Sequence, residues 1–318
     1  MIFDLAIIGG GPAGASAGIY AARQKLKTVL IAGDFGGQSA VSVEIQNWIG
    51  FKSISGELLA KQIKDHLYSY QGEDLVIKDG RQVTKIENLE AERPSGRSAS
   101  KFIITDNTGE SFEAKTVLIA TGASRRHLTV PGAKEFEQKG ITYCATCDGP
   151  LFAGQDVVVV GGGNAAIETT MQLAAYCASV TILEYNPNFK ADKIAIDKIL
   201  ANPKVKGITN VEIQEFKGDR FVKSIIYKDR VTGKVTELTT GGVFVEIGFV
   251  PATDFVRGLV DLTDFGAVAV DHRTQRTSLL GIWAAGDCTD VLYHQNNIAV
   301  GDAIKALEDI YLYLNIQE

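Results

Sequence analysis

A glycine-rich pattern occurs twice in this chain, and the repeat constrains the fold more than any other feature. The first copy covers residues 9–14 (GGGPAG) and the second covers residues 161–166 (GGGNAA). A short apolar run precedes each copy and a helix-compatible run follows it. Strand, tight glycine turn and helix in this order are typical of a dinucleotide-binding βαβ unit. Two such units predict an α/β protein with two Rossmann-like domains.

The first copy is expected to join a strand over residues 4–8 to a helix that begins at Ala13. Gly9 permits the tight turn, Gly11 lets the backbone approach a pyrophosphate, and Gly14 lets the helix pack close to the strand. The helix N-terminus then faces the phosphates. A close helix–strand contact without any ligand is the alternative interpretation of this turn.

An acidic residue is expected about 20 positions beyond each turn, where it accepts hydrogen bonds from a ribose. The second turn follows an unbroken apolar strand over residues 156–160, and the next strand, over residues 179–183, ends on Glu184. The corresponding strand of the first copy, over residues 27–31, ends near Asp34. Asp34 is displaced past the end of that strand, so its role stays open. For Glu184 the alternative is a solvated strand end.

A pair of cysteines, Cys144 and Cys147, lies between the two glycine turns within residues 143–149 (YCATCDG). Cysteines at this spacing can close a reducible disulfide, and a thiolate in such a motif has a lowered pKa. Half of a zinc site and two structural thiols are the alternatives. Zinc takes four ligands, and the remaining Cys177, Cys288 and four histidines show no second metal-binding spacing. The pattern therefore favours an electron relay, in which a redox-active dithiol lies between two dinucleotide sites, and no metal site is expected.

Further motifs accompany the two turns and the cysteine pair, and they occur along most of the chain. They are Gly36-Gly37-Gln38, Asn47-Trp48, Ala120-Thr121-Gly122, Asp148-Gly149, Glu168, Ile247-Gly248, Pro251 and Ala284-Ala285-Gly286-Asp287. From Phe3 to about Leu314 the chain resembles the low-molecular-weight bacterial thioredoxin reductases. The resemblance implies the three-layer ββα fold of pyridine nucleotide-disulfide oxidoreductases, with one Rossmann-like domain inserted in the other.

The resemblance also implies where each cofactor binds. A discontinuous FAD-binding domain is expected over residues 1–121 and 251–318, and a pyridine-nucleotide domain with the dithiol over residues 122–250. A polar, hairpin-like excursion over residues 78–113 belongs to the first domain, and residues 92–98 form its surface loop.

Residues that match the family's motifs are assigned as follows. The expected FAD contacts are Gly9, Gly11, Pro12, Ala13, Gly14, Asp34, Gly37, Gln38, Asn47, Thr121, Gly122, Gly286, Asp287, His294 and Gln295. The expected nicotinamide nucleotide contacts are Gly161, Gly163, Asn164, Ala165, Ala166, Glu184, Ile247 and Gly248. A packing or hydrogen-bonding role is the favoured interpretation of His294, and a catalytic base is the alternative.

The catalytic residues implied by the resemblance are Cys144, Cys147 and Asp148. Cys147 is the cysteine nearer the flavin, Cys144 attacks the disulfide of the partner, and Asp148 gives and takes the dithiol's protons. A turn-forming role is the alternative for Asp148.

One region departs from the family and bears on the choice of nucleotide. NADPH-dependent members carry a His-Arg-Arg run and a later Arg, whereas this chain has Glu-Tyr-Asn at residues 184–186 and Lys190. Charged hydrogen bonds contribute roughly 1.5 to 3 kcal/mol each, so their loss favours NADH, with NADPH as the second choice. Residues 183–192, 149–152 and 228–233 resemble the flavoprotein subunit of alkyl hydroperoxide reductase, which uses NADH.

The electron acceptor is expected to be a separate thioredoxin or glutaredoxin-like protein. The alkyl hydroperoxide reductase flavoprotein carries a thioredoxin-like region before its first strand, whereas this chain starts at that strand, and Ala145-Thr146 is the thioredoxin reductase form. A ferredoxin-fed thioredoxin reductase or a flavin dithiol oxidase, each with a decayed nucleotide site, is the alternative. A non-catalytic FAD-binding redox sensor is the alternative from another class.

Composition adds the remaining expectations. The net charge of −6 gives no support for nucleic-acid or anionic-membrane binding, and no apolar run approaches the 18 or so residues of a membrane span. There is no basic segment of a signal peptide, and four cysteines with one motif pair fit a reducing compartment. A cytoplasmic protein is expected, and the resemblance implies a homodimer.

Overall fold

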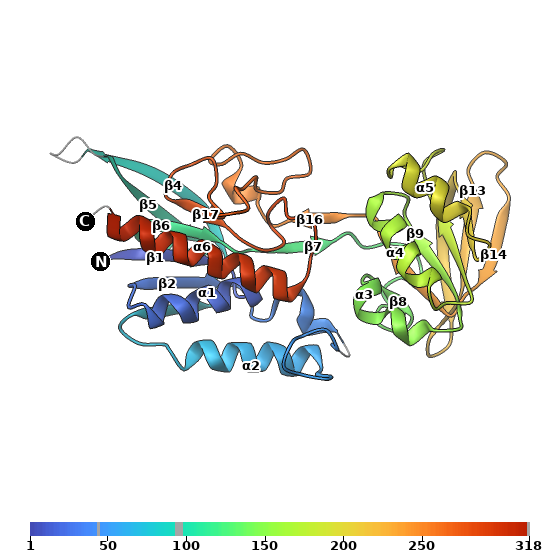
Figure 1. Cartoon of the computed structure of the whole chain (residues 1–318), viewed down its shortest axis with the longest axis horizontal. Coiled ribbons are helices and arrows are strands. Elements are labelled where there is room, and N and C mark those ends of the chain that lie inside the picture. Colours follow the sequence, from blue (N-terminus) through green and yellow to red (C-terminus); the bar gives the residue numbers. More distant parts are fainter. Residues whose placement is uncertain (43–44, 93–97, 317–318) are drawn as a thin grey trace. The chain divides into compact units, whose positions relative to one another are not determined.

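The chain folds into two compact units, shown in a computed structural model that describes residues 1–42, 45–92 and 98–316 (Figure 1). Unit 1 comprises Met1–Ser124 and Val250–Glu318, and unit 2 comprises Arg125–Phe249. The chain crosses between the units along two short strands, β7 (Ala123–Arg125) and β16 (Phe249–Pro251), which pair with each other. Unit 2 is therefore inserted in the sequence of unit 1.

A mixed sheet with the strand order β3-β2-β1-β6-β5-β4 forms the centre of unit 1, and β17 also pairs with β6. Its strands are β1 (Ile2–Ile8), β2 (Thr28–Ala32), β3 (Leu75–Asp79), β4 (Val83–Glu92), β5 (Ser98–Asp106), β6 (Ser111–Ile119) and β17 (Ile282–Ala284). The strands β3, β2, β1, β6 and β17 run parallel, whereas β4, β5 and β6 form an antiparallel meander. The expected polar excursion is therefore a β-hairpin, and its loop at residues 93–97 lies outside the described residues.

Both faces of this sheet are buried. Successive side chains of a strand point to opposite sides, so each strand contributes to the core on either face. Leu5 and Ile7 of β1 pack with the helices α1 (Pro12–Arg23) and α6 (Asn296–Ile316), whose alanines let them approach closely. Ala6 and Ile8 face the other way, onto a core formed with the hairpin and the segment before β17. Unit 1 also contains α2 (Gly56–Tyr68) and two short 3-10 turns, η1 (Gly37–Val41) and η3 (Asp254–Val256).

Unit 2 has three layers around a parallel sheet with the order β11-β10-β9-β15-β8. Its elements are β8 (Ile141–Thr142), α3 (Ala145–Asp148), η2 (Gly149–Phe152), β9 (Asp156–Val160), α4 (Asn164–Ala174), β10 (Ser179–Leu183), α5 (Lys193–Leu200), β11 (Val205–Ile208) and β15 (Gly242–Val245). A second sheet consists of β12 (Val211–Gly218), β13 (Val222–Asp229) and β14 (Val235–Thr239). Val157 and Val159 pack towards the helices, and Val158 and Val160 pack towards the second sheet.

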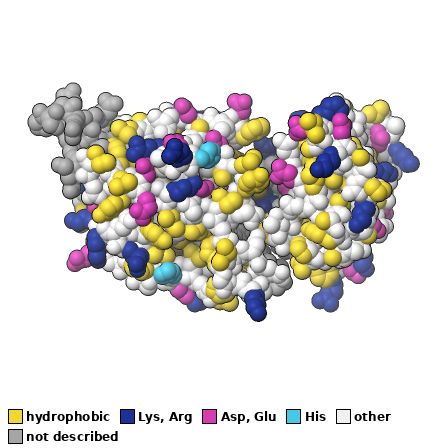
Figure 2. Space-filling model, in the orientation of Figure 1, with side chains coloured by type: hydrophobic (Ala, Val, Ile, Leu, Met, Phe, Trp, Pro, Cys, Tyr) yellow, Lys and Arg dark blue, Asp and Glu magenta, His cyan; other side chains and the backbone are white. Residues whose placement is uncertain are grey.

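The surface drawn in Figure 2 carries acidic and basic side chains interspersed over both units. Within residues 1–42, 45–92 and 98–316, no helix is both long and apolar enough to cross a membrane.

Candidate functional site

A crevice of about 850 Å³ opens above the first glycine turn, in unit 1. Ten of the residues predicted to contact FAD line it, namely Gly9, Gly11, Pro12, Ala13, Asp34, Gly37, Gln38, Thr121, Gly122 and Asp287. The turn lies at the carboxyl ends of the parallel strands, where open α/β sheets bind their ligands. Unit 1 thus has one continuous cavity at the predicted FAD site.

The glycines of this turn divide into those required by packing and one that faces open space. Gly9 has a φ of +120°, and a Cβ there would overlap the carbonyl of Ala120. A Cβ on Gly14 would overlap the carbonyl of Gly9, so the helix lies directly on the turn. At Gly11 the nearest atom to such a Cβ is 3.9 Å away. This open cradle at the N-terminus of α1 fits the pyrophosphate of FAD.

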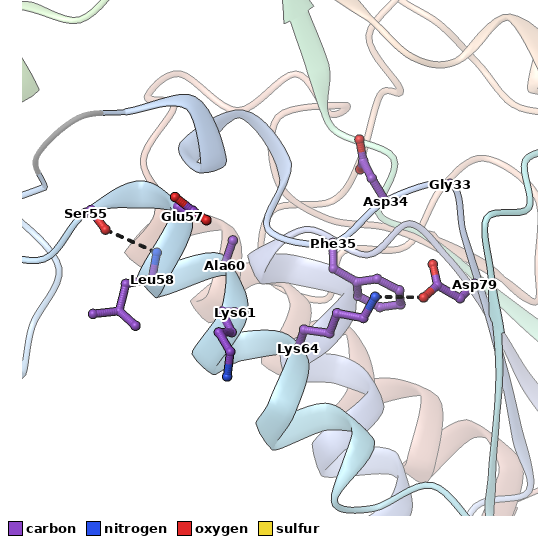
Figure 3. Close-up of a pocket in the computed structure, with 10 residues that line it drawn as sticks. All are labelled: Gly33, Asp34, Phe35, Ser55, Glu57, Leu58, Ala60, Lys61, Lys64 and Asp79. Carbon is purple, nitrogen blue, oxygen red and sulfur yellow. Dashed lines mark hydrogen bonds and ion pairs between the residues drawn. The ribbon is translucent and has the colours of Figure 1, made fainter.

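Asp34 lies at the rim of the crevice, where a second cavity of about 580 Å³ adjoins it (Figure 3). The figure shows the Asp34 carboxylate directed away from Lys64. The ammonium of Lys64 instead lies 2.7 Å from Asp79 and 4.8 Å from the ring centre of Phe35. Asp34 is exposed, and its carboxylate is therefore accessible to a ribose hydroxyl.

Five predicted FAD contacts lie outside the lining of this crevice: Gly14, Asn47, Gly286, His294 and Gln295. Two of them meet each other, because Nδ2 of Asn47 donates to Oε1 of Gln295 at 3.0 Å. Nδ1 of His294 lies 3.4 Å from Oδ1 of Asp287. The last loop before α6 therefore joins the residue-47 region to the acid at the end of β17.

The crevice also has lining residues that the sequence did not predict, including Arg81, Gln82, Thr253 and Asn296. Asn296 begins α6, and its side chain exchanges hydrogen bonds with Ser39 at 2.7 and 2.9 Å. An Asn at the start of a long helix is a recognisable signal. Arg81 and Gln82 belong to no motif, so nothing local marked them.

The second glycine turn, in unit 2, repeats the strand, turn and helix arrangement. Gly161 has a φ of +126°, and a Cβ there would overlap the carbonyl of Glu246. Gly163 precedes α4, and a Cβ there would have no neighbour within 4 Å. This open cradle at a helix N-terminus fits the pyrophosphate of a nicotinamide nucleotide. Ala166 is buried beneath the turn, whereas Ala165 is exposed.

Glu184 follows β10 and packs directly against the turn. Only 5% of the residue is exposed, and a Cβ on Gly162 would lie 2.5 Å from Oε2 of Glu184. Oε1 accepts hydrogen bonds from the backbone N–H of Asn186 at 2.7 Å and from Nδ2 of the same residue. One oxygen is therefore held within the loop, and the other faces the glycine turn, where a ribose hydroxyl would donate.

Three further predicted nucleotide contacts occupy different environments in unit 2. Oδ1 of Asn164 accepts from the backbone N–H of Asp192 at 2.9 Å, so its side chain fastens the loop after Glu184. Ile247 packs on the core shared with the second sheet, and Gly248 is exposed.

Cys144 and Cys147 form a disulfide at the start of α3, with their Cα atoms 5.3 Å apart. Cys144 occupies the N-cap, and its Sγ accepts from the backbone N–H of Cys147 at 3.1 Å. Because both sulfurs are bonded to each other, the pair is arranged for redox chemistry. Among the described residues, no group of three or more metal-ligating side chains surrounds them or lies elsewhere.

Asp148 lies directly beside the disulfide, and its carboxylate accepts a hydrogen bond from the hydroxyl of Thr142. Burial raises the pKa of the Asp148 carboxyl above its ordinary value, while Thr142 and the charge of Arg125 act in the opposite direction. A carboxyl with a raised pKa retains its proton more readily. Asp148 is thus suited to give a proton to a departing thiolate.

A second partly buried acid in unit 2, Glu246, was not predicted from the sequence. It follows β15, and its Oε1 accepts from the hydroxyl of Thr169 at 2.8 Å. Burial raises the pKa of Glu246 to about 7, with Glu168 contributing in the same direction and Arg125 opposing. Its only sequence signal was a charged residue directly after an apolar strand.

The two other cysteines, Cys177 and Cys288, are buried thiols. Burial raises the pKa of Cys177 and raises that of Cys288 to about 11. Thiols protonated at neutral pH are poor nucleophiles, so neither is suited to react.

Known proteins resemble the chain over its whole length. Residues 3–303 match the family described as pyridine nucleotide-disulphide oxidoreductase. The chain is 38% identical to a thioredoxin reductase of Mycolicibacterium smegmatis, over 100% of this chain and 98% of that protein. A solved thioredoxin reductase of Streptococcus pyogenes superimposes with a TM-score of 0.87 at 36% identity, over 99% of this chain and 98% of the other.

Two longer relatives match as well. The chain is 38% identical to an NADH dehydrogenase of Bacillus subtilis and 37% identical to an alkyl hydroperoxide reductase component of Escherichia coli. Each match covers 98% of this chain, which spans 58% of the length of either relative. These matches confirm the predicted resemblance and the predicted fold. The chain belongs to the pyridine nucleotide-disulphide oxidoreductase family.

Proposed function

We propose that the chain is a disulfide reductase that passes electrons from NADH, through FAD, to the Cys144–Cys147 disulfide and on to a thioredoxin or glutaredoxin-like protein. The observation that carries this proposal is the disulfide itself, with a partly buried acid beside it and a nucleotide-binding turn in the same unit. Membership of the family supports the use of FAD and a nicotinamide nucleotide. FAD, when bound, accepts a hydride from a nicotinamide and returns two electrons to a disulfide.

The residues of unit 2 handle the protons and the exchange of disulfides. Reduction of the Cys144–Cys147 bond consumes two electrons and two protons and leaves two thiols. Asp148 supplies a proton to one departing sulfur and takes a proton back when the thiolate is needed again. The Cys144 thiolate then attacks the disulfide of the partner protein, and Cys147 releases the mixed disulfide.

The preference for NADH rests on Glu184. Its Oε2, which faces the glycine turn, would accept a hydrogen bond from the adenosine ribose, whereas a 2'-phosphate would place like charges together in a buried site. Lys190 offers only a point charge, and its backbone N–H donates to Gly162 at 2.8 Å. We also propose, from the family resemblance, a homodimer in the cytoplasm; light scattering of the purified protein tests the first part.

The proposal is tested by anaerobic turnover with a panel of thioredoxins and glutaredoxins, each assayed with NADH and with NADPH. We expect the protein to hold FAD and to reduce at least one thioredoxin or glutaredoxin with NADH, with kcat/KM about tenfold to a thousandfold above that with NADPH. A protein that oxidises neither nucleotide but accepts electrons from a ferredoxin contradicts the proposal. Nucleotide oxidation that yields hydrogen peroxide and reduces no member of the panel contradicts it as well.

A further inference from the structure

The turn between β13 and β14 brings Arg230 against the residue that follows Glu184. The guanidinium carbon of Arg230 lies 3.8 Å from the ring centre of Tyr185, well within the range of a cation–π contact. Nη1 of the same side chain donates to the backbone carbonyl of Tyr185 at 2.9 Å. One arginine therefore holds both the ring and the backbone of Tyr185. Arg230 lies 45 positions after Tyr185 in the sequence. It places a cation beside the 184–186 turn, where this chain lacks the arginines of the NADPH-dependent family members.

Backbone hydrogen bonds continue from this arginine towards the acid. The N–H of Arg230 donates to the carbonyl of Asn210 at 2.7 Å, and the N–H of Asn210 donates to the carbonyl of Asn186 at 3.0 Å. Asn186 in turn donates to Oε1 of Glu184 at 2.7 Å. The turn at residues 184–186 is thus fixed on the side that faces the second sheet.

Arg230 is itself held in place by its own turn. Oδ1 of Asp229 accepts from the backbone N–H groups of Val231 and Thr232 at 2.9 and 2.8 Å. The N–H of Gly233 closes the turn by donating to the carbonyl of Asp229 at 2.8 Å. The backbone of Arg230 therefore starts from a defined position beside Tyr185.

Tyr185 remains 53% exposed although Arg230 stacks on it, so part of its surface is accessible to a ligand. In a βαβ nucleotide site, the acid at the end of the second strand marks the adenosine ribose. An aromatic ring next to that acid lies where an adenine base would stack.

We propose that Arg230 is a positioning residue for the adenosine half of the nicotinamide nucleotide. It holds the Tyr185 ring and the 184–186 turn so that the adenine stacks on Tyr185 while the ribose meets Glu184. This inference rests on the proposed use of NADH at the second glycine turn. In this proposal Arg230 shapes the site and does not bind the nucleotide directly, because one of its donors is already bonded to the Tyr185 carbonyl.

The test compares two hydride donors that differ only in the adenosine half, NADH and reduced nicotinamide mononucleotide. We expect Arg230→Ala to raise the KM for NADH about tenfold while kcat stays within about twofold. Both constants for the mononucleotide should stay unchanged, because it has no adenosine to position. Arg230→Lys should restore part of the NADH affinity, since an ammonium keeps the cation–π contact but lacks the planar fork. Arg220→Ala, in the β12–β13 turn at the other end of β13, is the matched control and should leave both donors unaffected.

A binding measurement avoids any dependence on the rate-limiting step. The Kd of ADP-ribose should rise with Arg230→Ala by the same factor as the KM for NADH. Unchanged use of NADH by Arg230→Ala overturns this inference alone and leaves the proposed function intact. An equal effect on the mononucleotide overturns it too, as does a loss confined to NADPH, which would assign Arg230 to a 2'-phosphate. A native protein that binds no nicotinamide nucleotide overturns the inference and the proposed function together.

Discussion

The middle glycines of the two turns, Gly10 and Gly162, occupy the same place in the pattern but meet different atoms. A Cβ on Gly10 would overlap the backbone carbonyl of Asp34, whereas a Cβ on Gly162 would lie against the side-chain oxygen of Glu184. In unit 1 the acid therefore closes the turn with its backbone and leaves its carboxylate exposed. In unit 2 the carboxylate itself is packed against the turn and fixed by Asn186. A carboxylate is thus held in place at the second turn, whereas the one near the first turn is exposed.

The acids near the candidate sites of the two units are held differently. In unit 1, Lys64 lowers the pKa of the Asp79 carboxyl. In unit 2, burial raises the pKa values of Asp148 and Glu246. The acid of unit 1 is therefore paired with a cation at the surface, whereas the two acids of unit 2 retain their protons more readily.

The largest expected effect comes from removing the dithiol of unit 2, because in the proposed function electrons leave the protein only through Cys144 and Cys147. Cys144→Ser and Cys147→Ser should each lower turnover with a protein disulfide by about a thousandfold or more. FAD content and hydride uptake from NADH should persist, since unit 1 and the nucleotide turn are untouched. Cys177→Ser, at a buried thiol of the same unit, is the control. Wild-type turnover in either dithiol variant would end the relay account.

The next effect concerns nucleotide choice. Changing Glu184 to His together with Tyr185 and Asn186 to Arg removes a buried carboxylate and adds two cations. The ratio of kcat/KM for NADH to that for NADPH should fall by about a hundredfold. Asp34→Asn, the corresponding acid of unit 1, should alter FAD affinity and leave this ratio alone. If this ratio changes with Asp34→Asn and not with the substitutions at residues 184–186, the assignment of the nicotinamide nucleotide to unit 2 is wrong.

The third glycine of each turn allows a matched pair of smaller changes. Gly11 and Gly163 have φ values of −70° and −86°, which any residue adopts, and both face open space. Alanine should therefore fold at either position but intrude on a pyrophosphate. We expect Gly163→Ala to raise the KM for NADH about tenfold with FAD retained, and Gly11→Ala to weaken FAD binding by a similar factor. Loss of FAD from the Gly163 variant would show that the two sites are not separate.

The smallest effect is on the free energy of unfolding, and it tests Glu246, the partly buried acid that follows β15. Because the pKa of Glu246 is about 7 when folded, against an ordinary value of 4.5, the folded state keeps a proton that the unfolded state releases between these values. The free energy of unfolding should therefore fall as pH rises from 4.5 through 7, by on the order of 1 to 3 kcal/mol. Glu246→Gln keeps the Thr169 hydrogen bond and should abolish this part of the fall in urea titrations. An unchanged pH dependence in the variant would mean that Glu246 is ionised in the folded protein.

Local patterns in the sequence predicted some elements to the residue. The strands predicted at 156–160 and 179–183 are β9 and β10, with these bounds. Residues 157–160 of β9 are all apolar and buried, as expected for a central strand of a parallel sheet. The first strand begins two residues earlier than expected, at Ile2, where pairing with Glu113 extends it. Cys144 and Cys147 were recognisable because their spacing alone permits a disulfide.

The residues that escaped prediction are placed by contacts distant in the sequence. Arg230 reaches Tyr185 because β12 begins beside Glu184, where the N–H of Val211 donates to the carbonyl of Glu184 at 3.0 Å, and β13 returns beside β12. No local pattern marks this pairing. Glu246, at the end of β15, is partly buried and meets Thr169 of α4, whose hydroxyl donates to it. Arg81 joins the crevice through the turn between β3 and β4. In each case the chemistry arises from topology, which fixes which distant side chains meet.

The central claim is that electrons from NADH reach the Cys144–Cys147 disulfide. The most direct measurement is to mix the FAD-loaded protein with NADH under anaerobic conditions, without acceptor, and to alkylate the thiols before mass spectrometry. Before mixing, the peptide with Cys144 and Cys147 should carry no alkyl group; afterwards, both cysteines should be alkylated while the absorbance of NADH is lost. Consumption of NADH with the disulfide intact, or no consumption at all, would contradict the account.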